Sequence, residues 1–540
     1  MNTTKLSAFT AATKTIVAML AVGALTASAQ STLTWDITPG TVGVGNNTIT
    51  GGGGTWNTSN GNWTTDAGTN NIAWNNVVGT PKNDAIIGGT AGTVTLGEPI
   101  SLRNLTINNT SGTYTITGSA LNFTGGTIVV PNPPNTSTVG AVIRSNITGA
   151  PALNLTLMDG DDQFTLNPVT DGSMSIGTVS GNGGLGSERL NLQGGTGSSG
   201  TIAGGSGGNK FNVSSGAWTL NGSATGYGHA ISGGTLTLKA NLNASHRSVT
   251  LSGTGVLNYN AANAVSATAA TSGAGSDNGF RLQTGATLDQ TSGAAITTST
   301  TNPSMTWEGN WTFLGSNGAN SDLNLGTGSV FLKAASPQVT VSNAATTMII
   351  GGVIANDDTA GRGLVKAGAG TLELRGVNTY TGKTTVNAGK LLIKSPGSLN
   401  ASSAVSVNGG ILAGNGTIHG PVTVSNLGSI APGTPAAPTG ILTINNNCTI
   451  TNNLNIVVNG TQCSKLVVTN ALTIVSGATI NVTELTPPPV GARVIATYNT
   501  LVGTFATVNS TTSMIIDHNY QGLNQIALIR LPPGTVILLH

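Results

Sequence analysis

The chain has 540 residues, of which only 7% are charged, whereas a typical soluble domain carries about 25%. Glycine contributes 78 residues and hydrophobic residues 38%, which excludes the apolar-poor, highly charged composition of a disordered protein. The formal net charge is +2, from 20 basic and 18 acidic residues, so there is no overall basic surplus with which to bind nucleic acid phosphates.

Residues 1–29 have the pattern of a secretory signal peptide. Lys5 and Lys14 make its start positive, and residues 15–27 form a short apolar core. Residues 27–29 (Ala-Ser-Ala) are a small-residue cleavage site. The apolar core is too short to span a bilayer, which needs about 20 residues. We therefore expect an exported mature chain that has no transmembrane segment and a net charge of zero.

Residues 30–130 are expected to form an N-terminal β region that caps the rest of the fold. This region contains a TWN…NWT…AW pattern around Trp56, Trp63 and Trp74. Residues 131–138 are a proline-rich break, because proline cannot donate a hydrogen bond to a strand ladder.

Beyond this break, residues 139–345 show irregular internal repeats and no helical period. Short alternating runs of Thr, Leu, Val and Ile, bounded by Gly, Asn and Ser, are typical of strands and turns. A recurring element reads Gly-x-(Leu, Ile or Trp), and it continues past residue 345. Its glycines are 18 to 21 residues apart within two groups, at Gly216, Gly234 and Gly255, and at Gly370, Gly389, Gly410 and Gly428.

This period predicts an all-β fold, a parallel β-helix (β-solenoid) with coils of about 20 residues that is capped at both ends. One such coil cannot bury its apolar side chains alone, but stacked coils bury a continuous column of them. Stacked Asn and Thr side chains are expected to form hydrogen bonds along the axis. About 22 coils would make a rod on the order of 100 Å long.

Residues 368–391 read GAGTLELRGVNTYTGKTTVNAGKL. This segment closely resembles the autotransporter-associated β-strand repeat of bacterial surface proteins, whose pattern is GxGTLxLxGxNTYTGxTTVxxGxL. The likeness covers residues 346–485, and the N-terminal tryptophan pattern is also similar to openings of such proteins. The resemblance implies a parallel β-helix passenger that a Gram-negative-type bacterium displays or secretes, with an adhesive or structural role.

The C-terminal segment, residues 486–540, departs from the family pattern. Three prolines at 487–489 mark a break, after which about 50 residues follow. A translocator barrel would need at least eight strands of about 10 residues each. We therefore expect a β-structured tail or cap here, no translocator barrel, and release or another sorting route.

Cys448 and Cys463 are the two cysteines of the chain. Export permits a disulfide, and the separation of fifteen residues is shorter than one predicted coil. Two interpretations stay open, either one bridge between the two sulfurs or two free thiols. Neither cysteine has neighbours that indicate a nucleophile or a zinc ligand.

Basic residues gather between positions 362 and 394, where Glu373 is the one acidic residue. The predicted period would bring Lys366 near Lys383 and Lys390 of the next coil. Such a patch would suit an acidic polysaccharide or a lipopolysaccharide, whereas the alternative is a set of solvated rim charges. The candidate binding residues are Lys366, Arg375, Lys383, Lys390 and Lys394.

Two acidic clusters leave other chemistry open, one of Asp159, Asp161 and Asp162 and one of Asp357 and Asp358. They are interpreted as solvated turns, and for the first cluster calcium binding is an alternative. Acid–base catalysis on a polysaccharide is another alternative.

Two glycine-rich strings, GTGSSG (195–200) and GGSGG (204–208), match nucleotide-binding and nucleophile motifs, but no predicted helix follows them. The five histidines are scattered, so we expect no catalytic residue, metal or cofactor.

Together these patterns predict an exported cell-surface or secreted structural or adhesive β-solenoid that is not an enzyme. Its expected partners are cell-surface or extracellular glycans, or further copies of itself, and not nucleic acid. The alternative is a β-helix enzyme or binding module that acts on polysaccharide. A secreted repeat with only a packing role is a third interpretation.

Overall fold

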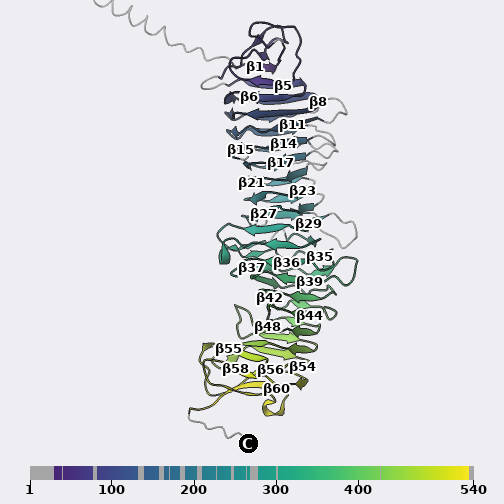
Figure 1. Cartoon of the computed structure of the whole chain (residues 1–540), viewed down its shortest axis with the longest axis vertical. Coiled ribbons are helices and arrows are strands. Elements are labelled where there is room, and N and C mark those ends of the chain that lie inside the picture. Colours follow the sequence, from purple (N-terminus) through teal and green to yellow (C-terminus); the bar gives the residue numbers. More distant parts are fainter. Residues whose placement is uncertain are drawn as a thin grey trace, which may run out of the picture.

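A computed structural model describes residues 30–533, except 39, 77–81, 132–138, 157–162, 170, 183–188, 204–209, 227, 245–247, 263, 268–277, 299–301 and 426. In these residues the chain forms an elongated rod, with β1 (Thr32–Trp35) near one end and β60 (Gln525–Arg530) near the other (Figure 1). The expected signal peptide and most of the proline-rich break lie outside the described residues.

The described residues form strands and two short 3-10 helices, η1 (Gly318–Ser321) and η2 (Tyr520–Gly522). The strands wind into a parallel β-solenoid of about 15 turns with about 24 residues in each, which confirms the predicted fold class. No helix in this part of the chain is long and apolar enough to cross a membrane.

The coils are longer and fewer than the sequence period suggested, because insertions occur at the corners. The coil length follows from the register of the ladder. Trp218 is paired with Leu236, 18 residues later, whereas Phe313 is paired with Val341, 28 residues later. The longer coil accommodates η1 between its strands.

Successive coils contribute short strands to ladders on three faces of the solenoid. One ladder, which we call the long ladder, is continuous over most of the rod. Its strands are β7 (Ile100–Leu102), β9 (Leu121–Phe123), β12 (Ile147–Thr148), β15 (Ser173–Ile176), β18 (Thr196–Ser199), β21 (Ala217–Leu220), β24 (Thr235–Leu238), β27 (Val256–Tyr259), β30 (Thr287–Gln290), β33 (Trp311–Phe313), β36 (Gln338–Val341), β39 (Leu364–Ala367), β41 (Thr384–Val386), β44 (Val405–Val407), β47 (Val422–Val424), β50 (Cys448–Ile450), β54 (Ala471–Ile474) and β57 (Thr500–Val502).

The glycine anchors of the sequence align in register, but on two different faces. Those of the first group precede β21, β24 and β27 of the long ladder, where Trp218, Leu236 and Leu257 stack in one buried column. Those of the second group precede another ladder that contains β40 (Thr371–Leu374), β42 (Lys390–Ile393) and β45 (Ile411–Gly414). Gly216 and Gly389 both have positive φ, which glycine adopts without steric cost.

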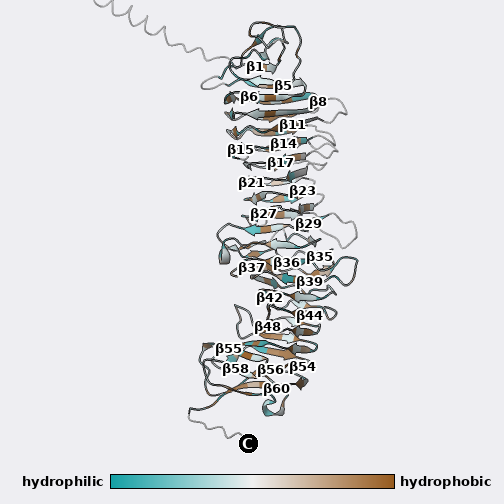
Figure 2. Cartoon of the chain, in the orientation of Figure 1, coloured by the Kyte–Doolittle hydropathy of each residue, from teal (hydrophilic) through white to brown (hydrophobic). Residues whose placement is uncertain are grey.

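Apolar and polar side chains alternate along the strands, as β24 shows with Leu236 and Leu238 buried and Thr235 and Thr237 directed outward. Apolar strand positions recur from one end of the rod to the other (Figure 2). Full burial of a Leu, Ile or Val side chain stabilises a fold by about 1.5–3 kcal/mol. The core is therefore a continuous column that is shared between neighbouring coils.

Asparagine side chains link the coils on the outside, as expected. Asn212 Nδ2 donates to Asn191 Oδ1 at 3.2 Å, and Asn408 Nδ2 donates to Asn387 Oδ1 at 3.0 Å. A third series near the C-terminal end joins Asn455, Asn481 and Asn509. These amides satisfy one another along the axis, so the outer surface is polar without carrying charge.

Four buried tryptophans, Trp35, Trp56, Trp63 and Trp74, fill the N-terminal end of the core. The ring centroids of Trp56 and Trp63 are 4.6 Å apart, and those of Trp63 and Trp74 are 4.9 Å apart. Here β1 pairs antiparallel with β3 (Trp63–Thr64), unlike the parallel ladders that follow. At the other end, β60 pairs antiparallel with β56 (Gly491–Thr497) and β59 (Ile515–Asp517).

Gly197 and Trp218 fit together in the core of the long ladder, where they are opposite each other on β18 and β21. A Cβ atom on Gly197 would lie 2.1 Å from Cζ3 of the Trp218 indole, so this position has no room for a side chain. The missing side chain of one coil therefore makes room for the largest side chain of the next.

We expect Gly197→Val to destabilise the solenoid by at least about 1–3 kcal/mol, because the added methyl groups overpack the column. Urea unfolding followed by circular dichroism measures this change. Ser198→Val adds a comparable side chain on the outward face and should have little effect. Trp218→Leu should reduce the cost of Gly197→Val in a double-mutant cycle. Equal costs for the two valine variants would contradict this packing.

Candidate functional site

Lys366, a member of the predicted basic patch, lies inside the core. Its side chain is fully buried, and its position on β39 is paired with Val339 and Val386 of the neighbouring coils. Its Nζ donates hydrogen bonds to the carbonyl oxygens of Ala367 at 2.7 Å, Gly368 at 2.8 Å and Ala388 at 3.1 Å. Burial lowers the pKa of the Lys366 amine to about 8. Lys366 was therefore wrongly assigned to a surface patch, and instead it joins the corners of two successive coils.

Most of the other cations in this segment contact carboxylates. Arg375 Nε is 2.5 Å from Glu373 Oε1, and Lys394 Nζ is 3.5 Å from the same oxygen. Arg362 forms two hydrogen bonds with Asp357, at 3.1 and 3.0 Å. Each of these pairs neutralises positive charge, so less of it remains to attract an acidic ligand.

Lys383 and Lys390 do not stack on Lys366. Lys383 is exposed and immediately precedes β41, whereas Lys390 is half-buried and begins β42 on a different face. The register pairs Lys390 with Thr371 of the preceding coil. Their binding to an acidic glycan stays a prediction.

The two cysteines are free thiols in the structure, so the disulfide interpretation is wrong. Cys448 is buried on β50 in the long ladder, where burial raises the pKa of its thiol to about 12. Cys463 lies in β52 (Gln462–Cys463), and its thiol donates to the carbonyl oxygen of Val494 at 3.3 Å. A raised thiol pKa disfavours the reactive thiolate form.

The other motifs do not assemble into one site in the described part of the chain. Asp159, Asp161 and Asp162, the string at 204–208, and two of the histidines lie outside it. The GTGSSG string lies in and beside β18, which is a strand of the solenoid. No group of three or more His, Cys, Asp or Glu side chains that could hold a metal occurs among the described residues.

A straight row of hydroxyl groups crosses the outward surface of the long ladder. The register places these residues on one another across β12, β15, β18, β21 and β24. None of them is ionisable, and each alternates along its strand with buried neighbours. We call this set the hydroxyl row: Thr148, Ser175, Ser198, Thr219 and Thr237.

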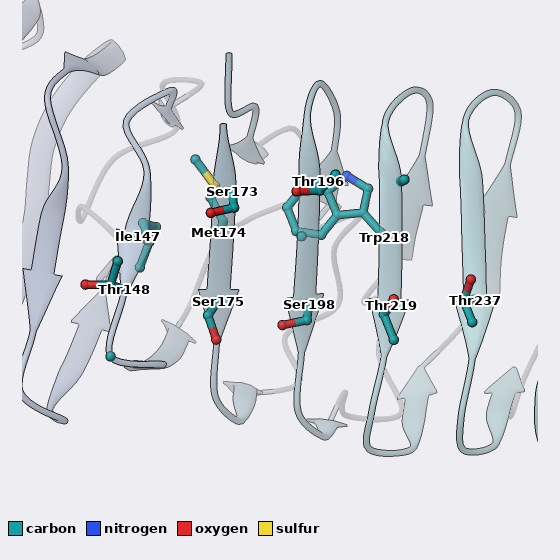
Figure 3. Close-up of a pocket in the computed structure, with 13 residues that line it drawn as sticks. Ile147, Thr148, Ser173, Met174, Ser175, Thr196, Ser198, Trp218, Thr219 and Thr237 are labelled. Atoms are coloured by element: carbon teal, nitrogen blue, oxygen red, sulfur yellow. The ribbon is translucent and has the colours of Figure 1, made fainter. Parts of the chain in front are cut away.

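The hydroxyl row runs through a depression of about 550 Å³ in the surface of the rod. Figure 3 shows the five side chains following one another across neighbouring strands. Ser173, Thr196 and Ala217 also line the depression. The depression therefore offers hydroxyl donors and acceptors together with small apolar surfaces, and no charge.

Sequence reasoning missed the hydroxyl row, although the glycine anchors contain a signal for part of it. Thr219 lies three residues after Gly216, and Thr237 lies three residues after Gly234. An anchor that positions an inward side chain two residues later also positions an outward one at the third residue. The remaining members follow coils of other lengths, which hid their alignment.

Comparisons with known proteins agree with this architecture. A profile of the family described as passenger-associated-transport-repeat matches residues 364–393, which include β39, β40, β41 and β42. Over this segment the chain is similar to that repeat family, as the sequence resemblance implied.

Two curated relatives are similar to part of this chain. The adhesin BmaC autotransporter of Brucella suis biovar 1 (strain 1330) is 36% identical over 164 residues, which cover 28% of this chain and 4% of the adhesin. An extracellular serine protease of Serratia marcescens is 47% identical over 78 residues, which cover 14% of this chain and 7% of the protease. The matched segments thus span only a small share of either relative.

The buried Lys366 should make stability depend on alkaline pH. The pKa of its amine is about 8 in the folded chain, compared with an ordinary value of 10.5. Between these values the unfolded chain binds a proton that the folded chain has lost, so folding stability rises with pH. The unfolding free energy of the wild type minus that of Lys366→Met should therefore increase from pH 8 to 10. A constant difference would contradict a titrating buried amine.

Proposed function

We propose that this chain is an adhesive or structural rod at the bacterial surface or in the extracellular medium, and that it contacts extracellular glycans. The observation that carries this proposal is the outer surface of the solenoid, which presents hydroxyls and amides in axial rows. A rod with repeated polar groups can make many weak contacts whose combined affinity exceeds that of any one.

The charges of the rod support contact rather than catalysis. Arg281 forms two hydrogen bonds with Glu308, at 2.8 and 2.9 Å, and Gln283 donates to the same carboxylate. Arg103 likewise bridges to Asp84 at 2.7 Å. Acid–base catalysis needs an acid and a base that both reach the substrate. Carboxylates held by basic partners on the rod surface instead serve to fix the fold.

Surface exposure and adhesion test this function together. Cell fractionation with antibody labelling should place the mature chain outside the cytoplasm. Beads coated with the purified chain should then adhere to surfaces covered with bacterial or host glycans, and enzymatic removal of the glycans should abolish adhesion. Beads coated with the heat-unfolded chain are the control. Retention of the chain in the cytoplasm, or adhesion that survives glycan removal, would contradict the proposal.

A further inference from the structure

We propose that the hydroxyl row binds an uncharged, extended polysaccharide that lies along the axis of the rod. This inference rests on the proposed function and names both the ligand class and its site. The site comprises Thr148, Ser175, Ser198, Thr219 and Thr237, within the depression of about 550 Å³.

The central hydroxyls are available to a ligand. In the part of the chain that the structure describes, no protein group forms a hydrogen bond with the side chains of Ser175, Ser198 or Thr219. At one end Thr148 Oγ1 donates to Asn122 Oδ1 at 2.9 Å. At the other end Asn258 Nδ2 reaches Thr237 Oγ1 at 3.5 Å. Amides therefore close the row at its ends, while its middle keeps both donors and acceptors.

The absence of charge selects the ligand class. All the outward positions of β9, β12, β15, β18, β21, β24 and β27 are Ser, Thr, Asn, Ala or Val. An anionic polymer would gain no attraction there, whereas a neutral sugar exchanges hydroxyl hydrogen bonds with hydroxyl and amide side chains. Ala217 and Val256 add small apolar patches that suit the C–H faces of sugar rings.

The spacing of the row also fits such a ligand. Parallel strands lie about 4.8 Å apart, and this distance is close to the length of one pyranose unit in an extended chain. Five consecutive coils can therefore meet about five consecutive sugar units, one hydroxyl for each. A polymer that crossed the rod would meet only one coil, so the match exists along the axis alone.

The row is rigid before any ligand binds. The backbone of β18 and β21 is held from below by the packing of Trp218 against Gly197, and from the sides by continuous ladder pairing. A ligand then does not have to order the hydroxyls that it contacts, which lowers the entropic cost of binding.

The test uses calorimetry with the full mature chain and cello-oligosaccharides of two to six units, together with affinity electrophoresis in a soluble mixed-linkage β-glucan. Affinity should rise with oligosaccharide length up to about five units. The triple variant Ser175→Ala, Ser198→Ala and Thr219→Val removes the three central hydroxyls that are available to a ligand. We expect its affinity for the hexamer to fall by at least about tenfold, since each lost hydrogen bond weakens binding.

A matched control carries Thr93→Val, Thr115→Val and Thr117→Val on β6 (Thr93–Leu96) and β8 (Leu105–Gly118), which lie on another face. Its affinity should equal that of the wild type. Equal losses in both variants, no binding of any neutral glucan, or binding only of polygalacturonate would overturn the proposal. Self-association in sedimentation that disappears in the triple variant would assign the row to a second copy instead. Surface adhesion that persists without glucan binding would overturn this inference and leave the proposed function standing.

Discussion

No coil of this chain has a hydrophobic core of its own. Its inward Leu, Ile, Val and aromatic side chains are buried because the next coil stacks on it in register, joined by parallel ladder hydrogen bonds on three faces. A slip of one residue in any strand would exchange its buried and exposed side chains. The column therefore exists only if apolar and polar residues alternate strictly along each strand. At the ends of the rod no further coil covers the core, so other groups, such as the tryptophan cluster, must cover it.

The same alternation explains the chemistry of the surface. Because every inward position is committed to the column, ligand contacts depend on the outward positions, and these are mostly Ser, Thr and Asn. Two arrangements reduce the charge on this surface. Some carboxylates are paired with arginine, as Glu308 is with Arg281. One lysine, Lys366, lies in the core, where three carbonyl oxygens accept hydrogen bonds from its Nζ. What remains outside is a polar surface with little free charge.

The fold class could be predicted because glycine anchors and alternating strands are local features. Trp218, Leu236 and Leu257 do share one column, as their anchors indicated. Coil length was underestimated, because corner insertions such as η1 do not change the ladder and leave no periodic signal. The position of Lys366 could not be read either, since whether a strand residue points inward depends on register rather than on its own polarity. The hydroxyl row was hidden for the same reason, as its members lie in coils of unequal length.

Because the corners tolerate insertions, the length of a loop and the geometry of the ladder can change independently in this fold, whereas in most folds the two are coupled. A coil of 18 residues and one of 28 residues occupy the same height on the ladder, so loops can diverge in sequence while the row beneath them stays straight. Duplication of a whole coil would likewise lengthen the rod without a new core. Repeated duplication would add one contact with a polymeric ligand for each new turn. The chemistry of each contact would stay the same.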